Sequence, residues 1–326
     1  MLIDKKSDAV NLMNEYGKNK IPFLFIIDFD MNEPHIIKYD EIGLYEILFD
    51  INGIKNYQPL DVSKSAAKFE KYPVSFDTYK KSYDKVVEEI TAGNTYLLNL
   101  TFPTEIKTEL SLKEIFYLSD AKYKLLFKNN FVVFSPETFV IIKDDSIFSF
   151  PMKGTIDASI PNAEKIILND KKEKAEHNTI VDLIRNDLNM VAKNVKVEKY
   201  RYIEKLITND KPLLQVSSII TGQLEKGFEE KLGEIIFTLL PAGSISGAPK
   251  KKTVEIINAV ENYKRGYYTG IFGFYDGKYL ESAVMIRFIE NAKDGLIYKS
   301  GGGITFMSNA EYEYQELIDK VYMPIV

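Results

Sequence analysis

Apolar residues recur every three or four positions in several stretches of the chain, and this spacing predicts helices. One such helix follows Ser75 and ends at Gly93, and its apolar positions are Tyr79, Tyr83, Val86, Val87 and Ile90. Another begins at Ser111, because Ser111 and Glu114 have the spacing of a capping box. The clearest helical pattern covers residues 169–194, and further helices are expected at residues 39–50, at 228–240, from about Lys251, and at 309–322.

Other stretches have the short apolar runs that are typical of strands. Residues 131–152 predict consecutive strands with a turn at Asp144 and Asp145. Strands are also expected at residues 23–29, 94–102, 213–224, 267–277 and 279–290, whereas residues 64–73 have the composition of a connector. Because strand clusters alternate with helices and many strands adjoin as hairpins, we expect an α+β fold of layered, largely antiparallel sheets flanked by helices.

The composition excludes several kinds of site. The 326 residues include no cysteine and only two histidines, His35 and His177. Disulfides, thiol nucleophiles, Cys-ligated metals, His-rich metal centres and most Ser-His-Asp arrangements are therefore excluded. Any bound metal would have oxygen ligands, which favours magnesium, manganese or calcium, and proton transfer would fall largely to Glu, Asp, Lys or Tyr.

The charge pattern and the apolar runs bear on partners and location. The net charge is −5 and no polybasic run is present, so a nucleic-acid partner is not expected. The N-terminus lacks the pattern of a secretory signal, and apolar runs such as residues 21–27 are far shorter than the ~20 residues of a membrane helix. We expect a cytoplasmic protein without membrane association.

Two pairs of glutamates occupy helix positions three residues apart. Glu173 and Glu176 begin the helix of residues 169–194, at the head of the face that its apolar stripe Ile180, Leu183 and Ile184 buries. Glu313 and Glu316 have the same spacing on the last predicted helix, beside another apolar stripe. Either pair alone is typical of a solvated helix face. Two pairs in a chain poor in other metal ligands favour a site for a cation such as Mg²⁺.

Two glycine-rich segments are candidates for binding an anion, although both also have the composition of ordinary turns before helices. "PAGSISGAPKKKT" lacks the Walker spacing, but its backbone N–H groups and Lys250 precede a predicted helix. "SGGGITF" would let the backbone approach a ligand closely. Arg287 lies among apolar residues on a predicted strand, where it needs a carboxylate partner that is either internal or part of a substrate.

Lys153 follows an apolar strand in "FSFPMKGTI" and is either a surface lysine at a strand end or a reactive amine. As a nucleophile it would have to be neutral, and neutralising a lysine of ordinary pKa at pH 7 costs about 4–5 kcal/mol. Desolvation by Phe148, Phe150 and Met152 would offset part of that cost. The local sequence alone leaves both interpretations open.

Seven segments occur together in an order that is specific to one enzyme family. They are "SPETF", "PMKGT", "AEHNTIVDLIRNDL", "PAGSISGAPK", "RGYYTGIFG", "MIRF" and "SGGGI…EYEYQE". With them the sequence resembles the chorismate-utilising enzymes, which include anthranilate synthase component I, aminodeoxychorismate synthase component I, isochorismate synthase and salicylate synthase. The resemblance runs from about residue 75 to the C-terminus. We therefore expect residues 1–70 to form a short N-terminal portion packed on the main domain, and residues 71–326 to form the chorismate-binding catalytic domain.

Lys153 indicates the branch of this family. The anthranilate branch typically has Pro-Ile-Ala-Gly-Thr at this motif and the aminodeoxychorismate branch has Pro-Ile-Lys-Gly-Thr, so "PMKGT" is most similar to aminodeoxychorismate synthase component I (para-aminobenzoate synthase component I). The resemblance implies that Lys153 attacks C2 of chorismate and expels the C4 hydroxyl. Ammonia then adds at C4 and frees the lysine. The product would be 4-amino-4-deoxychorismate, a precursor of 4-aminobenzoate and folate.

The resemblance also implies the other site residues. Glu137 in "SPETF" matches the general acid/base of the family. The positions that match the Mg²⁺ region are Glu173, Glu176, Glu313 and Glu316. The implied substrate-binding residues are Arg287, Tyr268, Ser246, Gly301, Gly302, Gly303, Thr155 and Lys250.

The sequence departs from the family at three places. Leu214 stands where relatives usually have His, Leu97 takes a position often held by Gln, and "NDLNMV" replaces the usual Asn-Asp-(Leu/Ile)-Gly-Arg-Val. The missing His would remove a polar contact near the substrate ring. This departure is the only support for one alternative, a chorismate-binding subunit with little turnover. Anthranilate synthase component I also stays open as an alternative, and Lys153 argues against it.

The family implies a partner as well. Ammonia from glutamine requires an amidotransferase, and this chain has no cysteine to serve as the nucleophile of one. We expect a separate glutamine amidotransferase subunit, component II, to dock on the chain and supply ammonia.

Overall fold

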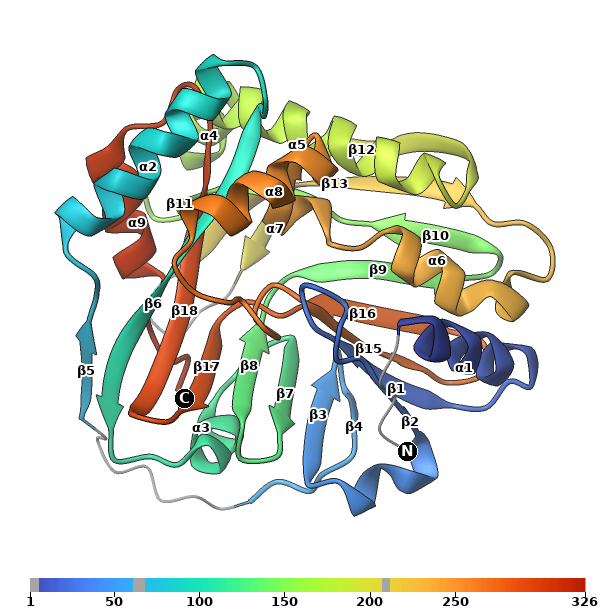
Figure 1. Ribbon diagram of the computed structural model, residues 1–326. Helices are drawn as coiled ribbons and strands as arrows, with labels where there is room; N and C mark the ends of the chain where they lie inside the picture. Colours follow the sequence, from blue (N-terminus) through green and yellow to red (C-terminus); the bar gives the residue numbers. More distant parts are fainter. Residues whose placement is uncertain (1–5, 61–67, 207–211, 326) are drawn as a thin grey trace.

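The computed structural model describes residues 6–60, 68–206 and 212–325, and it folds them into two large sheets with helices packed against them (Figure 1). Each sheet has nine strands within these ranges, and every pair of neighbouring strands is antiparallel. The predicted α+β class with layered antiparallel sheets is confirmed. None of the helices in the described ranges is long and apolar enough to cross a membrane.

The first sheet has the order β11-β13-β10-β9-β16-β15-β1-β2, with β12 paired to β13. Its strands are β1 (Phe23–Ile27), β2 (His35–Lys38), β9 (Thr138–Lys143), β10 (Ser146–Ser149), β11 (Met152–Asp157), β12 (Lys193–Leu206), β13 (Leu213–Gln223), β15 (Ile271–Tyr275) and β16 (Leu280–Val284).

The second sheet has the order β14-β6-β18-β17-β8-β7-β3-β4, with β5 paired to β6. Its strands are β3 (Ile47–Ile51), β4 (Ile54–Lys55), β5 (Phe69–Tyr72), β6 (Leu97–Thr108), β7 (Tyr123–Phe127), β8 (Phe131–Ser135), β14 (Gly247–Ala248), β17 (Phe288–Ala292) and β18 (Gly295–Ile304). The long strands β6 and β18 run side by side over much of their length (Figure 1).

The helices pack against these sheets, and α5 and α9 carry the two glutamate pairs. The α-helices are α1 (Lys6–Lys18), α2 (Phe76–Thr91), α3 (Leu112–Leu118), α4 (Ala163–Asn169), α5 (Lys171–Asn189), α6 (Leu232–Thr238), α7 (Gly243–Ser246), α8 (Lys250–Val260) and α9 (Ala310–Asp319). Two 3-10 helices, η1 (Tyr39–Leu44) and η2 (Phe228–Lys231), complete the described elements.

Strand β1 shows how the core holds the two sheets together. All five of its residues are buried, which is typical of a strand covered on both faces. Phe23, Phe25 and Ile27 belong to the apolar cluster that includes α1 and α6, whereas Leu24 and Ile26 belong to the cluster formed with β3 and β7 of the second sheet. The first sheet therefore lies between a helical layer and the second sheet at this end. The described residues before position 60 supply strands to both sheets, and the predicted division near residue 70 stays a prediction.

Several local predictions are confirmed. Ser75 caps α2 through a hydrogen bond from the N–H of Thr78, and Ser111 and Glu114 form the predicted capping box at the start of α3. Strands β8, β9 and β10 occur where consecutive strands were predicted, and α5 and α9 lie within the predicted helical stretches. These features depend on residues close together in the sequence.

Other local predictions are wrong, because contacts distant in sequence decide them. Residues 39–50 form η1 and then β3, since Ile47, Phe49 and Ile51 alternate inward and pair with β7. The single strand predicted at 279–290 is interrupted between β16 and β17. The connector predicted at 64–73 includes β5, and its residues 64–67 lie outside the described residues. The elements α1, β7 and β12 were among those not predicted from the sequence.

Candidate active site

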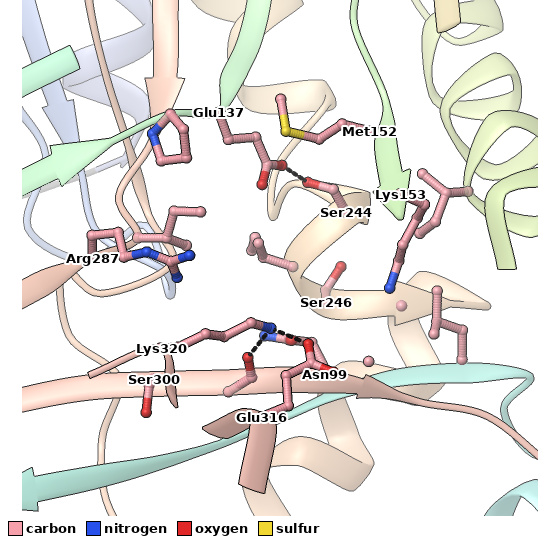
Figure 2. A pocket seen from close by; sticks show the side chains of 18 of the residues that line it. Asn99, Glu137, Met152, Lys153, Ser244, Ser246, Arg287, Ser300, Glu316 and Lys320 are labelled. Carbon is pink, nitrogen blue, oxygen red and sulfur yellow. Dashed lines mark hydrogen bonds and ion pairs between the residues drawn. The ribbon is translucent and has the colours of Figure 1, made fainter. Parts of the chain in front are cut away.

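A cavity of about 270 Å³ lies where the two sheets and three helices meet (Figure 2). The first sheet contributes residues of β11 and β13, and the second contributes residues of β6 and β18. The predicted residues that line it are Glu137, Lys153, Thr155, Ser246, Tyr268, Arg287, Gly301, Gly303 and Glu316. Residues from distant parts of the sequence thus gather around one space.

Lys153 reaches the cavity from a β-bulge at the edge of the first sheet. Met152 pairs with Ser217 and Thr155 with Gln215, so Lys153 and Gly154 together oppose a single residue of β13. Gly154 has a φ of +84°, which glycine adopts without steric cost. A bulge of this kind changes the direction of a side chain in the strand. The sequence Lys-Gly-Thr therefore provides a local reason for Lys153 to point out of the regular pleat.

The ammonium of Lys153 is paired with a carboxylate. Its Nζ lies 3.1 Å from Oε2 of Glu176 on α5, and the side chain is 27% exposed. Burial lowers the pKa of Lys153, but the Glu176 carboxylate and the neighbouring glutamates outweigh this effect and raise the pKa above its ordinary value. A Cβ atom placed on Gly303 would lie 3.4 Å from this Nζ, so the backbone of β18 passes close to the lysine at this point.

Glu137 faces the same cavity just before β9. Its Oε1 accepts a hydrogen bond from the hydroxyl of Ser244 on α7 (Figure 2). Burial raises the pKa of Glu137, and the Ser244 hydrogen bond and the charges of Lys153, Lys320 and Arg287 oppose this rise without cancelling it. A carboxyl group with a raised pKa in a cavity wall is suited to donate a proton near neutral pH.

Arg287 lies opposite Lys153 across the cavity (Figure 2). It is not on a strand as predicted, but sits between β16 and β17 with a φ of +53°. Its Nε donates to the hydroxyl of Tyr322 at 3.3 Å, and no carboxylate of the described residues forms an ion pair with it. The guanidinium is therefore free to take a carboxylate of a ligand. Tyr268 is buried in the same wall.

Some residues of the two glycine-rich segments line the cavity, and others contact neighbouring elements instead. Ser246 lines the cavity, with its hydroxyl donating to the carbonyl of Ala242 at 2.8 Å. Gly302 lies beside α9, where an added Cβ would be 3.5 Å from Oε2 of Glu313. Lys250 does not line the cavity, and its role in substrate binding stays a prediction that its position does not support. Its Nζ donates to the carbonyl of Leu239 at 2.8 Å and lies 3.0 Å from Oδ1 of Asp187.

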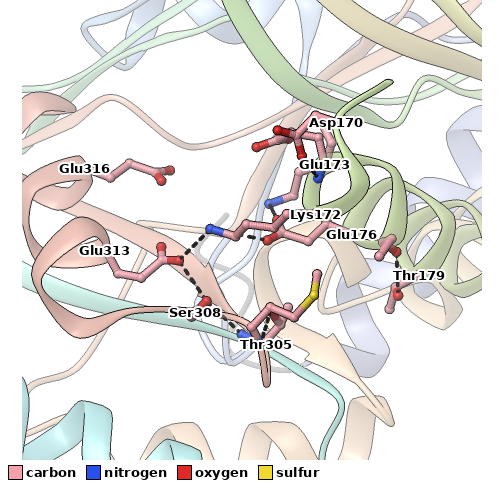
Figure 3. Close-up of polar contacts among 12 residues, drawn as sticks. Asp170, Lys172, Glu173, Glu176, Thr179, Thr305, Ser308, Glu313 and Glu316 are labelled. Carbon is pink, nitrogen blue, oxygen red and sulfur yellow. Dashed lines mark hydrogen bonds and ion pairs between the residues drawn. The ribbon is translucent and has the colours of Figure 1, made fainter. Parts of the chain in front are cut away.

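A second cavity of about 330 Å³ adjoins the first and contains the predicted metal ligands (Figure 3). Lys153, Thr155, Gly303 and Glu316 line both cavities. All four glutamates line the second one, which brings the pairs of α5 and α9 together: Glu173, Glu176, Glu313 and Glu316. Glu176 and Glu313 are buried. The predicted grouping of these carboxylates is present in the fold.

Three lysines lie among these carboxylates. Lys153 pairs with Glu176, Lys320 with Glu316, and Lys172 with both Glu176 and Glu313. As the side chains stand, no group of three or more His, Asp or Glu residues in the described ranges is arranged to hold a metal. Binding a metal would therefore require these side chains to change partners.

The donor set nevertheless fits a hard divalent cation. Four carboxylates offer only oxygen, the ligand type that Mg²⁺ prefers. Burial and the charge of Glu176 raise the pKa of Glu173, and the charges of Lys153 and Lys172 oppose this rise without cancelling it. A cation bound by the four glutamates would favour the ionised form of Glu173.

Several residues of the two cavities were not predicted from the sequence. The spacing of Lys172 and Lys320 could have indicated them, because each stands four residues from a predicted metal ligand on the same helix face. Ser244 lies in a quoted motif but was not singled out.

Leu214 stands where relatives usually have His, and it does not line the cavity, whereas its neighbour Gln215 does. The wall therefore keeps a polar side chain at this point. The loss of a polar contact near the substrate ring stays a prediction, and so does the chorismate-binding alternative with little turnover that rests on it.

Comparisons with known proteins agree on one family. Residues 37–325 match the family model described as chorismate binding enzyme. The chain is 50% identical over 316 residues to an "Uncharacterized PabA-like protein" of Haemophilus influenzae, covering 96% of this chain and 95% of that one. It is 31% identical over 369 residues to anthranilate synthase component 1 of Saccharolobus solfataricus, covering 96% and 84%.

A more distant relative and a solved structure extend the comparison. The chain is 28% identical over 271 residues to aminodeoxychorismate synthase component 1 of Bacillus subtilis, covering 77% of this chain and 55% of that one. The solved structure of MenF, the menaquinone-specific isochorismate synthase of Escherichia coli, matches with a TM-score of 0.75 at 16% identity, covering 98% of this chain and 82% of that one. This last likeness concerns the fold.

Proposed function

The chain belongs to the family of chorismate binding enzymes, and from this premise we propose that it aminates chorismate at C4 to give 4-amino-4-deoxychorismate. The observation that carries the proposal is the position of Lys153. Its amine enters the cavity from a bulge, between Glu137 and the four glutamates. The amination branch of the family has lysine at this motif, and the anthranilate branch typically has alanine.

The proposed reaction uses Lys153 as the nucleophile and Glu137 as the acid. Lys153 leaves its ion pair with Glu176, gives its proton to solvent and forms a bond from Nζ to C2 of the ring. Both ring double bonds shift and the C4–O bond breaks, and the hydroxyl leaves as water with the proton of Glu137. Ammonia then forms a bond to C4, both double bonds shift back and the C2–N bond breaks. Lys153 leaves as a neutral amine, and the new ammonium group returns a proton to Glu137.

The charges of the cavity suit a dianionic substrate. Arg287 can hold the carboxylate of the enolpyruvyl arm as a planar, bidentate donor, with Tyr268 beside it. We propose that Glu173, Glu176, Glu313 and Glu316 hold Mg²⁺, which when bound would neutralise and fix the ring carboxylate. Placing the ring between Arg287 and the glutamates would bring C2 toward Lys153 and C4 toward Glu137.

Ammonia must come from outside this chain. We propose a separate glutamine amidotransferase subunit, since the sequence has no cysteine to act as a glutaminase nucleophile. Glutamine alone should then support no turnover by the isolated chain, whereas an ammonium salt should. Turnover with glutamine and no second subunit would contradict this part of the proposal.

The deciding experiment is a product assay with the purified chain, Mg²⁺, chorismate and an ammonium salt. The expected product is 4-amino-4-deoxychorismate, separated by chromatography and identified by mass. Formation of only anthranilate would favour the second candidate, anthranilate synthase component I, which the relative from Saccharolobus solfataricus supports. Formation of only isochorismate would also overturn the proposal.

A further inference from the structure

Lys172 joins the two helices that carry the glutamate pairs. From the first turn of α5, its Nζ lies 3.8 Å from Oε1 of Glu176 and 3.4 Å from Oε1 of Glu313 on α9 (Figure 3). We propose that Lys172 is a built-in competitor of the metal, whose ammonium holds these two carboxylates in the metal-free protein and leaves them when a divalent cation binds. The inference rests on the metal site of the proposed function and adds a residue that sets its affinity.

Burial makes an exchange of cations necessary. The side chains of Glu176 and Glu313 are only 8% and 4% exposed, and a buried carboxylate left without a compensating charge is strongly destabilising. Glu176 keeps its pair with Lys153, but Lys172 is the one ammonium paired with Glu313 among the described residues, so a metal that takes Glu313 must arrive as Lys172 departs. Lys172 is able to depart, because its own side chain is 41% exposed and can be solvated outside the cavity.

The other two lysines are held more firmly. Lys320 Nζ lies 2.6 Å from Oε1 of Glu316 and also donates to the carbonyl of Gly301 at 2.9 Å. Lys153 is closer to Glu176 than Lys172 is, and it lines the cavity that we assign to the substrate. Lys172 lines only the cavity of the glutamates and contacts the two carboxylates at longer distances. It is therefore the ammonium that a metal displaces most easily.

The orientation of Glu313 supports the same conclusion. Its Oε1 accepts a hydrogen bond from Ser308 at 2.7 Å, and this is the oxygen that faces Lys172. The carboxylate is thus held toward the position of the ammonium by a neutral donor that stays when Lys172 leaves. With Lys172 outside, four carboxylates face two ammonium groups and one divalent ion, which balances the charge of the cavity.

The test is calorimetric titration of Mg²⁺ alone into the full chain without chorismate. The variants are wild type, Lys172→Met, Lys172→Arg and Lys174→Met. Lys174 is an exposed lysine on the same helix, and its substitution makes the same change in net charge. We expect Lys172→Met to bind Mg²⁺ about tenfold more tightly, because a positive charge within 4 Å of the ligands is removed. Lys172→Arg should bind it no more tightly than wild type, and Lys174→Met should change the affinity less than twofold.

Thermal unfolding supplies a second readout that does not depend on turnover. In the presence of a chelator, Lys172→Met should have a lower Tm than wild type, because two buried carboxylates lose a cation. Mg²⁺ should raise the Tm of Lys172→Met at lower concentrations than it does for wild type. Mg²⁺ binding by Lys172→Met but not by wild type would also support the inference.

Two results would overturn the inference. They are equal or weaker Mg²⁺ affinity in Lys172→Met, and no Mg²⁺ binding by either protein. Equal affinity together with a raised KM for chorismate would make Lys172 a substrate ligand instead. A product other than 4-amino-4-deoxychorismate would overturn the proposed function and leave the Mg²⁺ titration intact. Failure of the inference about Lys172 and failure of the proposed function therefore give different results.

Discussion

The Nζ of Lys153 and Oε2 of Glu176 lie 3.1 Å apart, which joins the proposed nucleophile to a proposed metal ligand. The pair connects the edge strand β11 to α5, and so links the two cavities. Two roles for Lys153 can therefore be separated by experiment. The lysine either acts through its charge, as the partner of Glu176, or through its amine, as a nucleophile.

Substituting Lys153 with arginine and with alanine should distinguish these roles. Arginine keeps the positive charge but cannot lose its proton in a protein, so it cannot attack C2. If Lys153 is the nucleophile, both variants should lose roughly 10³-fold or more in the rate of amination at saturating ammonium. If Lys153→Arg keeps most of the wild-type rate, the nucleophilic role is wrong.

Mass spectrometry tests the same role directly. Wild type incubated with Mg²⁺ and chorismate, without ammonia, should gain the mass of chorismate less one water, located on the peptide that contains Lys153. The Lys153→Ala protein should gain none.

Ser244 should control the pH range of activity through Glu137. Its hydroxyl donates to the Glu137 carboxylate and so favours the ionised form. Glu137 acts as an acid only while protonated, so activity falls as pH rises through its raised pKa. Substituting Ser244 with alanine should raise the pKa of Glu137 further and move the alkaline limb of the kcat profile to higher pH, by about one unit.

The matched control is Ser300→Ala, because Ser300 lines the same cavity but donates to the carbonyl of Leu317 instead. Its alkaline limb should stay in place. A Ser244→Ala enzyme with a lower rate and an unmoved limb would mean that Ser244 does not tune Glu137.

The sequence predicts the features of the site that depend on local periodicity. Glu173 and Glu176 head a buried face because α5 is amphipathic, and Glu313 and Glu316 follow the same rule on α9. The bulge of Lys153 also has a local cause in Gly154. That the two helices bring their carboxylates into one cavity follows from the family resemblance, since no local pattern determines which helices meet.

The errors arise where distant contacts fix a side chain. Lys250 is the first residue of α8, close to the predicted start of that helix, but Asp187 on α5 and the carbonyl of Leu239 hold its ammonium away from the cavity. Arg287 reaches the cavity only because the chain leaves β16 with a positive φ before entering β17. The partners of Lys250 lie far from it in the sequence, and no local pattern predicts the positive φ of Arg287.

Substitutions at Gln215 and at Leu214 can be compared to find which of the two residues affects substrate turnover. Within the described residues its Nε2 donates to the sulfur of Met152 at 3.0 Å, which is a weak acceptor, and to the hydroxyl of Ser217 at a long 3.5 Å. The side chain lines the cavity and keeps hydrogen-bonding capacity for a substrate. Substituting Gln215 with leucine should lower kcat/KM for chorismate about tenfold, the loss expected for one hydrogen bond.

Leu214→Ala is the control for Gln215→Leu, because adjacent residues of a strand point to opposite faces and Leu214 does not line the cavity. It should change kcat/KM less than twofold. A larger kinetic effect at Leu214 than at Gln215 would support the prediction that position 214 lies near the substrate ring.

His35 should make the stability of the fold depend on pH. Its Nε2 is 2.9 Å from the hydroxyl of Tyr267, and its ring packs 4.8 Å from that of Phe127. Burial, assisted by the charge of Lys128, lowers the pKa of His35 to about 4, against an ordinary value near 6.5. As pH falls below 6.5 the unfolded chain takes up a proton before the folded chain does. The stabilising effect is therefore full above about pH 6.5 and is lost progressively as the pH falls to about 4.

Denaturant unfolding of wild type and His35→Phe at pH 7 and pH 4.5 measures this effect. The shift corresponds to roughly 3 kcal/mol at most, and we expect about 2 kcal/mol after allowing for partial solvent access to the imidazole. The phenylalanine variant cannot take up the proton, so its free energy of unfolding should fall less between the two pH values. His177 and all carboxylates are common to both proteins, so the difference between the two proteins isolates His35. Parallel pH dependence in wild type and His35→Phe would show that His35 is not buried as a neutral ring.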